Sequence, residues 1–178
     1  MLKLVILDRD GVINYDSPEY IKSPEEWHAI PGSLEAIARL NKAGFKVAIA
    51  TNQSGVGRGY YSLDVLEKIN QKMLDEMKKV DAHIDALFFC PHKPEDKCDC
   101  RKPKPGLLLK IADYLKIDLK EAVMVGDSPR DIQAAQAAGT DGILVGEEAE
   151  VPDLAHAVEL ILNLKTDFGA DRFKKKVI

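Results

Sequence analysis

Short apolar runs alternate along the chain with stretches in which apolar residues recur at helical spacing. The apolar runs have the length of buried strands and cover residues 2–8, 46–51, 86–90, 121–127 and 142–145. The helical stretches lie near 33–43, 62–79, 106–116, 130–138 and 153–163. Because strands that are apolar throughout are buried on both faces, this alternation indicates a parallel sheet with helices on each side. The pattern predicts an α/β fold with a doubly wound, mostly parallel Rossmann-like sheet.

Residues that start and stop helices support these limits. Gly32 and Ser33 open the first helical stretch, and Gly44 follows its end. Ser62 is placed to cap the second stretch, and Pro129 falls where the first turn of a helix tolerates proline. Local sequence therefore fixes both ends of the first helix and the starts of two others.

Length and composition indicate one domain. The chain has 178 residues, 46% of them hydrophobic and 30% charged, and we expect a single domain over 1–178. A formal net charge of −4 gives no general attraction to nucleic acid or to an anionic membrane. No apolar run approaches the roughly 20 residues of a membrane span, and acidic residues come too early for a signal peptide. We expect a cytoplasmic monomer that binds neither nucleic acid nor membrane.

Polar residues follow the predicted strands at the edge where a parallel sheet binds ligands. Asp8 ends the first strand, and Asp10 and Gly11 follow it in a sharp turn. Thr51 ends the second strand, and Asp127 ends the fourth. Neighbouring carboxylates repel unless a cation or a shared proton relieves them, and oxygen ligands suit Mg²⁺. The three aspartates are therefore candidate magnesium ligands, whereas "DRDG" taken alone could be a simple turn.

All three cysteines and one histidine gather in the segment "CPHKPEDKCDC". Cys90 and His92 form one pair, and Cys98 and Cys100 form a second. Three thiolates and one imidazole complete the tetrahedral set of a structural zinc ion and leave no open position for catalysis. A redox pair would favour Cys-x-x-Cys, which the sequence lacks. We predict a zinc-binding loop, with chance clustering as the alternative.

Four segments resemble, in order and position, the motifs of the haloacid dehalogenase superfamily of phosphatases: "DRDGV", "TNQSG", "RKPKPG" and "VGDSPRD". The similarity extends from residue 2 to about residue 145. It implies a sheet of the haloacid dehalogenase type, with a minimal cap because no insertion is large enough for a cap domain. It also implies a Mg²⁺-dependent phosphatase.

By this resemblance, Asp8 would be the nucleophile that forms an aspartyl-phosphate, and Asp10 would be the general acid and base. Mg²⁺ would be held by the Asp8 carboxylate, the Asp10 carbonyl and Asp127. Thr51 and Asn52 would donate hydrogen bonds to the phosphoryl oxygens. Each role is thus assigned to a residue at a strand end.

The third motif of the superfamily supplies a cation to the active site. Lys102 would neutralise charge on the nucleophile and on the phosphoryl group, and Arg101 would bind the distal end of the substrate. Zinc would hold the loop so that these cations face the phosphate. The alternative is Lys104 as the active-site cation. Asp131 has two open roles, since it could orient a magnesium-bound water or simply occupy the first turn of a helix.

Two groups within the superfamily share a zinc loop of this form. The segments "TNQSGVGRGYY" and "PGSLEAIARLNKAGF" favour phosphatases that remove the C7 phosphate of D-glycero-D-manno-heptose 1,7-bisphosphate, for nucleotide-activated heptose and lipopolysaccharide biosynthesis. A histidinol-phosphate phosphatase of histidine biosynthesis is the alternative. Asp16, Gln53 and Ser54 would contact the sugar phosphate. A non-catalytic phosphoryl- or metal-binding module is a more distant alternative.

Overall fold

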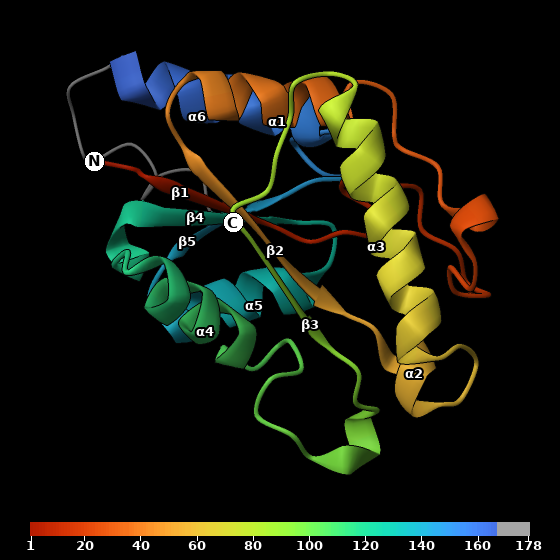
Figure 1. The fold of residues 1–178 in the computed structure, drawn as a ribbon. Coiled ribbons are helices and arrows are strands. Elements are labelled where there is room, and N and C mark those ends of the chain that lie inside the picture. Colours follow the sequence, from red (N-terminus) through yellow and green to blue (C-terminus); the bar gives the residue numbers. More distant parts are fainter. Residues whose placement is uncertain (167–178) are drawn as a thin grey trace.

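The computed structural model describes residues 1–166, and its centre is a parallel sheet with helices on both faces (Figure 1). The strands are β1 (Leu4–Leu7), β2 (Lys46–Asn52), β3 (Ala86–Cys90), β4 (Ala122–Gly126) and β5 (Asp141–Leu144). Their order is β3-β2-β1-β4-β5, and all neighbours run parallel. The strand order reverses at the central β1, which confirms the predicted doubly wound α/β fold.

Helices follow the strands in the predicted alternation. They are α1 (Ser33–Lys42), α2 (Ser54–Gly57), α3 (Leu63–Lys78), α4 (Gly106–Leu115), α5 (Pro129–Ala138) and α6 (Leu154–Thr166). Short 3-10 turns cover Pro24–Glu26, Pro94–Asp96 and Leu119–Glu121. The sequence does not predict α2 or these turns, because segments this short show no helical period. Ser62 caps α3 as expected, accepting a hydrogen bond from the Val65 N–H (3.2 Å).

Alternate residues of each strand face two separate apolar cores. Val5 and Leu7 point to the side covered by α1, α3 and α6 (Figure 1). Leu4 and Ile6 point to the side covered by α4 and α5. All four side chains are fully buried. Burial on both faces accounts for the continuous apolar runs in the sequence, and the polar side chains gather at the carboxyl ends of the strands.

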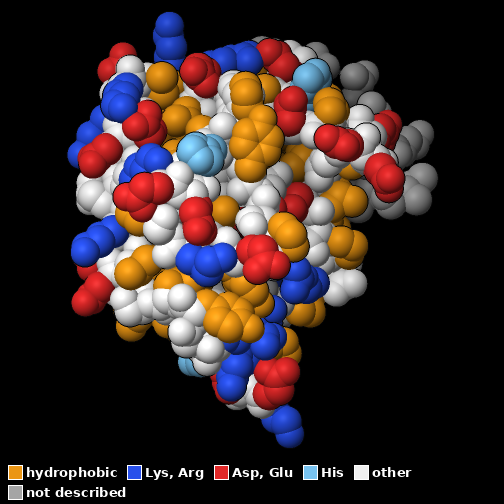
Figure 2. All heavy atoms as spheres, turned by 90° about the vertical axis from the view of Figure 1, so that its right-hand side faces the viewer, with side chains coloured by type: hydrophobic (Ala, Val, Ile, Leu, Met, Phe, Trp, Pro, Cys, Tyr) orange, Lys and Arg blue, Asp and Glu red, His pale blue; other side chains and the backbone are white. Residues whose placement is uncertain are grey.

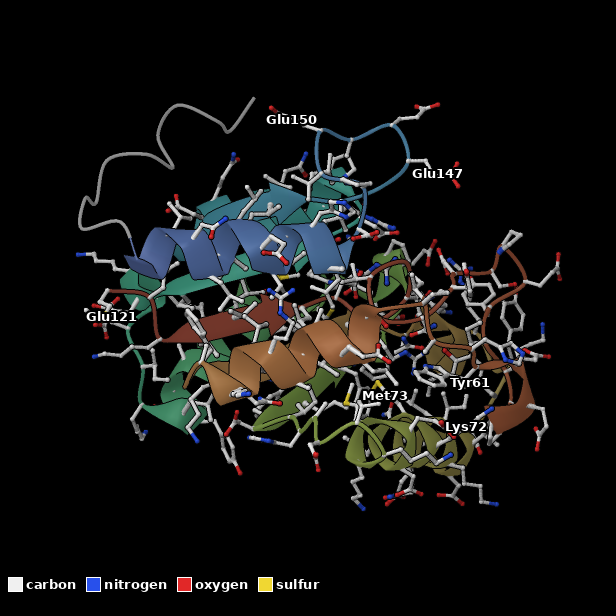
Figure 3. The ribbon with its side chains drawn as sticks, turned by 90° about the horizontal axis from the view of Figure 1, so that it is seen from above. Tyr61, Lys72, Met73, Glu121, Glu147 and Glu150 are labelled. Carbon is white, nitrogen blue, oxygen red and sulfur yellow. The ribbon has the colours of Figure 1, made fainter. Side chains whose placement is uncertain are left out.

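The loop between β1 and α1 is anchored to α3. Trp27 of this loop is 1% exposed. Lys72 of α3, labelled in Figure 3, donates hydrogen bonds to the carbonyl oxygens of Pro24 (2.7 Å) and Trp27 (3.0 Å). The segment that follows the first acidic motif is therefore held against the body of the protein near its middle.

The face of the molecule that carries α3 shows acidic and basic side chains side by side (Figure 2). On α3 itself, Lys78 pairs with Asp75 (3.2 Å) and Lys79 with Glu76 (2.7 Å). Such exposed pairs add little stability, because water and salt screen them. Among residues 1–166, no helix is both long enough and apolar enough to cross a membrane.

Candidate active site

The carboxyl ends of β1 and β4 bring carboxylates together. Asp8 follows β1 directly, and Asp127 follows β4. Asp131 lies in the first turn of α5, where it forms a capping box with Ser128. One oxygen of each of the three aspartates lies within 4.8 Å of the others. The structure therefore brings Asp8 and Asp127 together, as the sequence predicts, and adds Asp131 as a third member of this cluster.

Lys102 is the cation that contacts the cluster. Its side chain is 2% exposed, and its Nζ lies 3.0 Å from Asp8 Oδ1 and 2.6 Å from Asp131 Oδ1. Lys104, the alternative, is exposed and donates instead to the carbonyl oxygen of Cys98 (2.6 Å). The geometry places Lys102, and not Lys104, against the candidate nucleophile.

Strand β2 fixes Lys102 at both ends. The Asn52 side chain donates from Nδ2 to the Lys102 carbonyl (3.0 Å) and accepts from the Lys102 N–H (3.0 Å). At the other end, Lys102 Nζ donates to the carbonyl oxygen of Ala50 (2.7 Å). These bonds leave one N–H of the Asn52 amide for a ligand. Asn52 thus places the active-site cation, a role that the sequence does not predict.

The turn after β1 requires glycine at position 11. Gly11 has a φ of +81°, and a Cβ there would overlap the carboxylate of Asp127. Its N–H donates to the Asn14 carbonyl (2.8 Å), which closes the turn. Because glycine has no side chain, the acidic segments after β1 and β4 can approach each other closely.

Burial and repulsion raise the pKa values of the clustered carboxyl groups. Burial, opposed by Lys102 and reinforced by Asp131, raises the pKa of Asp8 from 3.8 to about 7. Burial and the neighbouring Asp131 raise the pKa of Asp127 to about 6. Burial alone would lower the pKa of Lys102, but Asp8 and Asp131 hold this pKa above its ordinary value. The raised pKa values of Asp8 and Asp127 indicate that the nearby cations do not offset the burial and mutual repulsion of these carboxylates.

The formal charges around the acidic cluster also indicate a deficit of positive charge. The acidic cluster with Lys102 and the adjacent Arg9–Asp10 ion pair comprise six charged groups: Asp8, Asp10, Asp127, Asp131, Arg9 and Lys102. Four carboxylates and two cations leave a net charge of −2 when all are ionised. One divalent cation would neutralise this charge, and carboxylate oxygens are the ligands that Mg²⁺ accepts. The residues present thus fit a magnesium ion.

Residues predicted to bind substrate differ in exposure. Thr51, Gln53 and Ser54 are 1%, 3% and 8% exposed, and Gln53 donates to both Thr51 and Asp10. Asp16 is exposed, and Arg101 is half-buried and donates to a backbone carbonyl of the cysteine-rich loop (3.3 Å). Within the part of the chain that the structure describes, neither Asp16 nor Arg101 forms an ion pair with the acidic cluster.

The cysteine-rich loop gathers its candidate ligands. The Sγ atoms of Cys90, Cys98 and Cys100 and Nδ1 of His92 all lie within 4.8 Å of one another. Cys90 Sγ is 3.6 Å from Cys98 Sγ and 3.6 Å from His92 Nδ1, and Cys100 Sγ lies closer, 3.0 Å from Cys90 Sγ and 3.3 Å from His92 Nδ1. Ligand atoms of a tetrahedral zinc site with Zn–S bonds of about 2.3 Å are about 3.7 Å apart. The loop can therefore hold a metal ion directly before the segment that carries Lys102.

Several polar residues around Asp10 are absent from the sequence prediction. Arg9 is fully buried and forms a salt bridge with Asp10 (3.0 Å), and buried Asn14 donates to the same carboxylate (2.9 Å). Tyr61 and Asn70 bond to the partners of Asp10 from more distant segments. The only sequence signal is the position of Arg9 between two motif aspartates. The roles of Asn14, Asn70 and Tyr61 around Asp10 are visible only in the folded structure.

A parallel sheet with clustered carboxylates and a buried lysine at its carboxyl edge places the protein among the α/β folds that can bind a metal ion and an anionic ligand at that edge. A family model for haloacid dehalogenase-like hydrolases matches residues 2–139. The chain belongs to the haloacid dehalogenase-like hydrolase family, as its four motifs predict.

Named relatives and solved structures give more detail. D-glycero-beta-D-manno-heptose-1,7-bisphosphate 7-phosphatase of Pseudomonas putida is 52% identical over 144 residues, which are 81% of this chain and 82% of the relative. The Escherichia coli protein of the same name is 37% identical over 172 residues, with 92% and 90% covered. D,D-heptose 1.7-bisphosphate phosphatase from B. bronchiseptica, solved with magnesium and phosphate, matches with a TM-score of 0.86 at 45% identity. That match covers 92% of this chain and 99% of the other.

Proposed function

We propose that this chain is a Mg²⁺-dependent phosphatase that removes the C7 phosphate of D-glycero-D-manno-heptose 1,7-bisphosphate. The observation that carries the proposal is Asp8 at the end of β1, with Lys102 Nζ 3.0 Å from its carboxylate. The names of the relatives support the substrate and make the β anomer the first to test. They disfavour histidinol phosphate, and the complete set of catalytic residue types disfavours a non-catalytic module.

In this mechanism Asp8 attacks phosphorus in line. A bond forms between an Asp8 oxygen and phosphorus while the phosphorus–C7 oxygen bond breaks, and Asp10 protonates the departing alcohol. Asp10 then removes a proton from the water that attacks the aspartyl-phosphate, so that phosphate leaves and Asp8 is restored. Lys102 offsets the negative charge between Asp8 and the phosphoryl group, and the Thr51 hydroxyl and the free N–H of Asn52 donate to phosphoryl oxygens.

Asp8, Asp127 and the Asp10 carbonyl would hold Mg²⁺, which when bound supplies positive charge to the phosphoryl oxygens. Asp131 contacts Lys102 (2.6 Å) and lies beside Asp8 and Asp127. We therefore assign Asp131 to the orientation of Lys102 and of water at the metal, and not to helix capping alone.

We further propose that Cys90, His92, Cys98 and Cys100 bind a structural zinc ion. The support is the approach of their ligand atoms within 4.8 Å. Reduced thiols of this kind are typical of the cytoplasm, where we place the protein as a monomer. With the zinc loop held in this way, Arg101 would reach the distal end of the sugar phosphate, and Asp16 and Ser54 would contact its hydroxyls.

Magnesium affinity should fall steeply as the pH drops below about 7. Asp8 and Asp127, with pKa values raised to about 7 and about 6, must lose protons to bind the ion. Below its own pKa, each of the two carboxyl groups should weaken Mg²⁺ binding about tenfold for each unit of pH. The two groups together predict a Mg²⁺ Kd about 100-fold weaker at pH 5.5 than at pH 8. Calorimetric titration of the zinc-loaded, magnesium-free protein measures this change.

The Asp8→Asn variant is the matched control for this titration. With Asp127 alone titrating, the Kd should weaken only a few-fold over the same range. The stability of the metal-free protein should change with pH in the opposite direction to that expected from an ordinary salt-bridged carboxylate, whose pKa is lowered on folding. Because both pKa values are raised on folding, the metal-free protein gains stability as the pH falls from about 7 toward 4. A Mg²⁺ Kd that stays constant from pH 8 to pH 5.5 would contradict this account.

Substrate preference tests the proposed function directly. We expect kcat/KM with Mg²⁺ on the β anomer of the heptose 1,7-bisphosphate to exceed that on histidinol phosphate and simple sugar phosphates by about 100-fold or more. The Asp8→Asn protein is the blank for contaminating phosphatases. A preference for histidinol phosphate would leave the mechanism intact and refute the substrate, whereas no turnover of any ester would refute both.

A further inference from the structure

The carboxylate of Asp10 is held at both oxygens by the protein. Its Oδ1 accepts hydrogen bonds from Arg9 Nε (3.0 Å) and Asn14 Nδ2 (2.9 Å), and its Oδ2 accepts from Gln53 Nε2 (2.8 Å). Arg9 has no exposed surface and is itself fixed, since its Nη1 donates to Asn70 Oδ1 in α3 (3.0 Å). The plane of the carboxyl group is therefore set by buried donors and not by solvent.

The direction of the Gln53 amide is fixed by Tyr61. The Tyr61 hydroxyl donates to Gln53 Oε1 (2.7 Å), while Nε2 donates to Thr51 Oγ1 (2.9 Å) as well as to Asp10. With the carbonyl end tied to a donor, the N–H end must face Asp10. A rotated amide would instead point its oxygen at the carboxylate, which repels it.

Tyr61 occupies its place because position 55 is glycine. A Cβ on Gly55 would overlap the Tyr61 ring, so the α2 segment leaves room for this side chain. Tyr61 is buried, with 7% of its surface exposed. Burial raises the pKa of Tyr61 to about 12, which keeps its hydroxyl a donor at neutral pH.

We propose that Arg9, Gln53 and Tyr61 are positioning residues for Asp10, and that they fix the direction in which Asp10 passes its proton to the leaving alcohol. This inference rests on the proposed phosphatase function. It also changes the expectation for Gln53. Its amide bonds to three protein side chains and is 3% exposed, so a positioning role replaces the predicted contact with substrate.

The donors are shared unequally between the two oxygens of Asp10, because Arg9 Nε, Arg9 Nη2 and Asn14 Nδ2 face Oδ1, whereas Gln53 Nε2 and the more distant Arg9 Nη2 face Oδ2. Arg9 Nη2 lies 3.2 Å from Asp10 Oδ2 and 3.0 Å from Oδ1. In the proposed step Oδ2, which faces fewer donors, carries the proton, while Arg9 and Asn14 hold Oδ1. The proton on Oδ2 then moves to the C7 oxygen as the phosphorus–oxygen bond breaks, and the ion pair between Arg9 and Asp10 is restored.

The test compares two leaving groups. A heptose alkoxide needs a proton as it departs, whereas the p-nitrophenolate ion is stable without one. For the Tyr61→Phe variant we expect kcat/KM to fall about tenfold or more on the heptose bisphosphate and by no more than about twofold on p-nitrophenyl phosphate. Tyr114→Phe is the control, because Tyr114 is 63% exposed and packs on Phe88, away from the site. It should match wild type on both esters.

Two further variants extend the test. In an Asp10→Asn background, Tyr61→Phe should cause no additional loss on the heptose ester, because no acid remains to be positioned. Arg9→Lys keeps the buried charge but loses the planar fork that spans both carboxylate oxygens, so it should also lose activity selectively on the heptose ester. Melting temperature and zinc content show whether each variant is folded.

The outcomes separate the two proposals. Equal losses on both esters, or no loss, for Tyr61→Phe while Asp10→Asn remains selective would overturn the positioning role alone. If Asp10→Asn loses no more on the heptose ester than on p-nitrophenyl phosphate, the proposed mechanism is wrong and the positioning role falls with it. Selective loss in Tyr61→Phe and Arg9→Lys, absent from Tyr114→Phe, supports the role.

Discussion

Asp8→Asn should reduce turnover of every phosphate ester by about 10⁴-fold or more and yet yield a more stable metal-free protein. Asparagine cannot form the aspartyl-phosphate, so the loss does not depend on the leaving group. The gain in stability follows from the raised pKa of Asp8, about 7 against 3.8. A carboxylate whose folded-state pKa is raised weakens folding when it is ionised, by an amount on the order of 1–4 kcal/mol at pH 8.

Denaturant unfolding of the zinc-loaded, magnesium-free proteins at pH 8 and pH 5 measures this gain. It should shrink at the lower pH, where Asp8 of the wild type is mostly protonated in the folded state. The control is Asp113→Asn, the same substitution at an exposed carboxylate of α4 that pairs with Lys116 (2.8 Å). It should change neither turnover nor the pH dependence. Asp8→Asn turnover within tenfold of wild type would rule out Asp8 as the nucleophile.

Loss of Cys98, a candidate zinc ligand, should lower kcat by about 100-fold and reduce the thermal stability. Metal binding provides the free energy that orders the loop between β3 and α4, and ordering costs about 1–2 kcal/mol per residue. This loop ends at Lys102, whose Nζ contacts Asp8 at 3.0 Å. Cys98→Ser is preferred to Cys90→Ser because Cys98 is half-buried, whereas Cys90 is fully buried in the core and would lose packing as well.

Zinc content and kcat of the same preparation decide this prediction. Glu95→Gln is the control within the loop, because Glu95 is exposed and is not one of the candidate ligands. It should keep both zinc and activity. If zinc-free Cys98→Ser protein retained wild-type kcat, then the bonds of Lys102 to Asn52, Ala50 and Asp131 would be sufficient to place it, and the metal would serve only stability.

The fold could be predicted because its signals are local and repeated. Strands β1 and β4 are apolar throughout, each long helix has one apolar side, and Ser62 and Pro129 mark helix starts that the structure confirms. Strand β1 is shorter than the apolar run 2–8, because the chain turns at Asp8 after one last hydrogen bond from its N–H to the Val125 carbonyl (2.9 Å). Such an ending depends on tertiary contacts that no local pattern encodes.

The site was predictable where its residues stand at strand ends in recognisable motifs. Asp8, Asp127 and Lys102 come together in the structure, and the four zinc-loop ligands do so too. The surroundings of Asp10 were not predictable, because Asn70 and Tyr61 act on it only through Arg9 and Gln53, and no local pattern shows which side chains they bond. A buried arginine also runs against the usual exposure of charged residues, and only its salt bridge explains it.

The central position of β1 has a consequence for synthesis on the ribosome. β1 is the first strand to emerge, and β2 can pair with one of its edges early, but its other edge pairs with β4, Leu4 opposite Ala122. More than half of the chain must therefore leave the exit tunnel before the nascent sheet can close. Until then Asp8 has neither Asp127 nor Asp131 beside it, so the acidic cluster is completed late in synthesis.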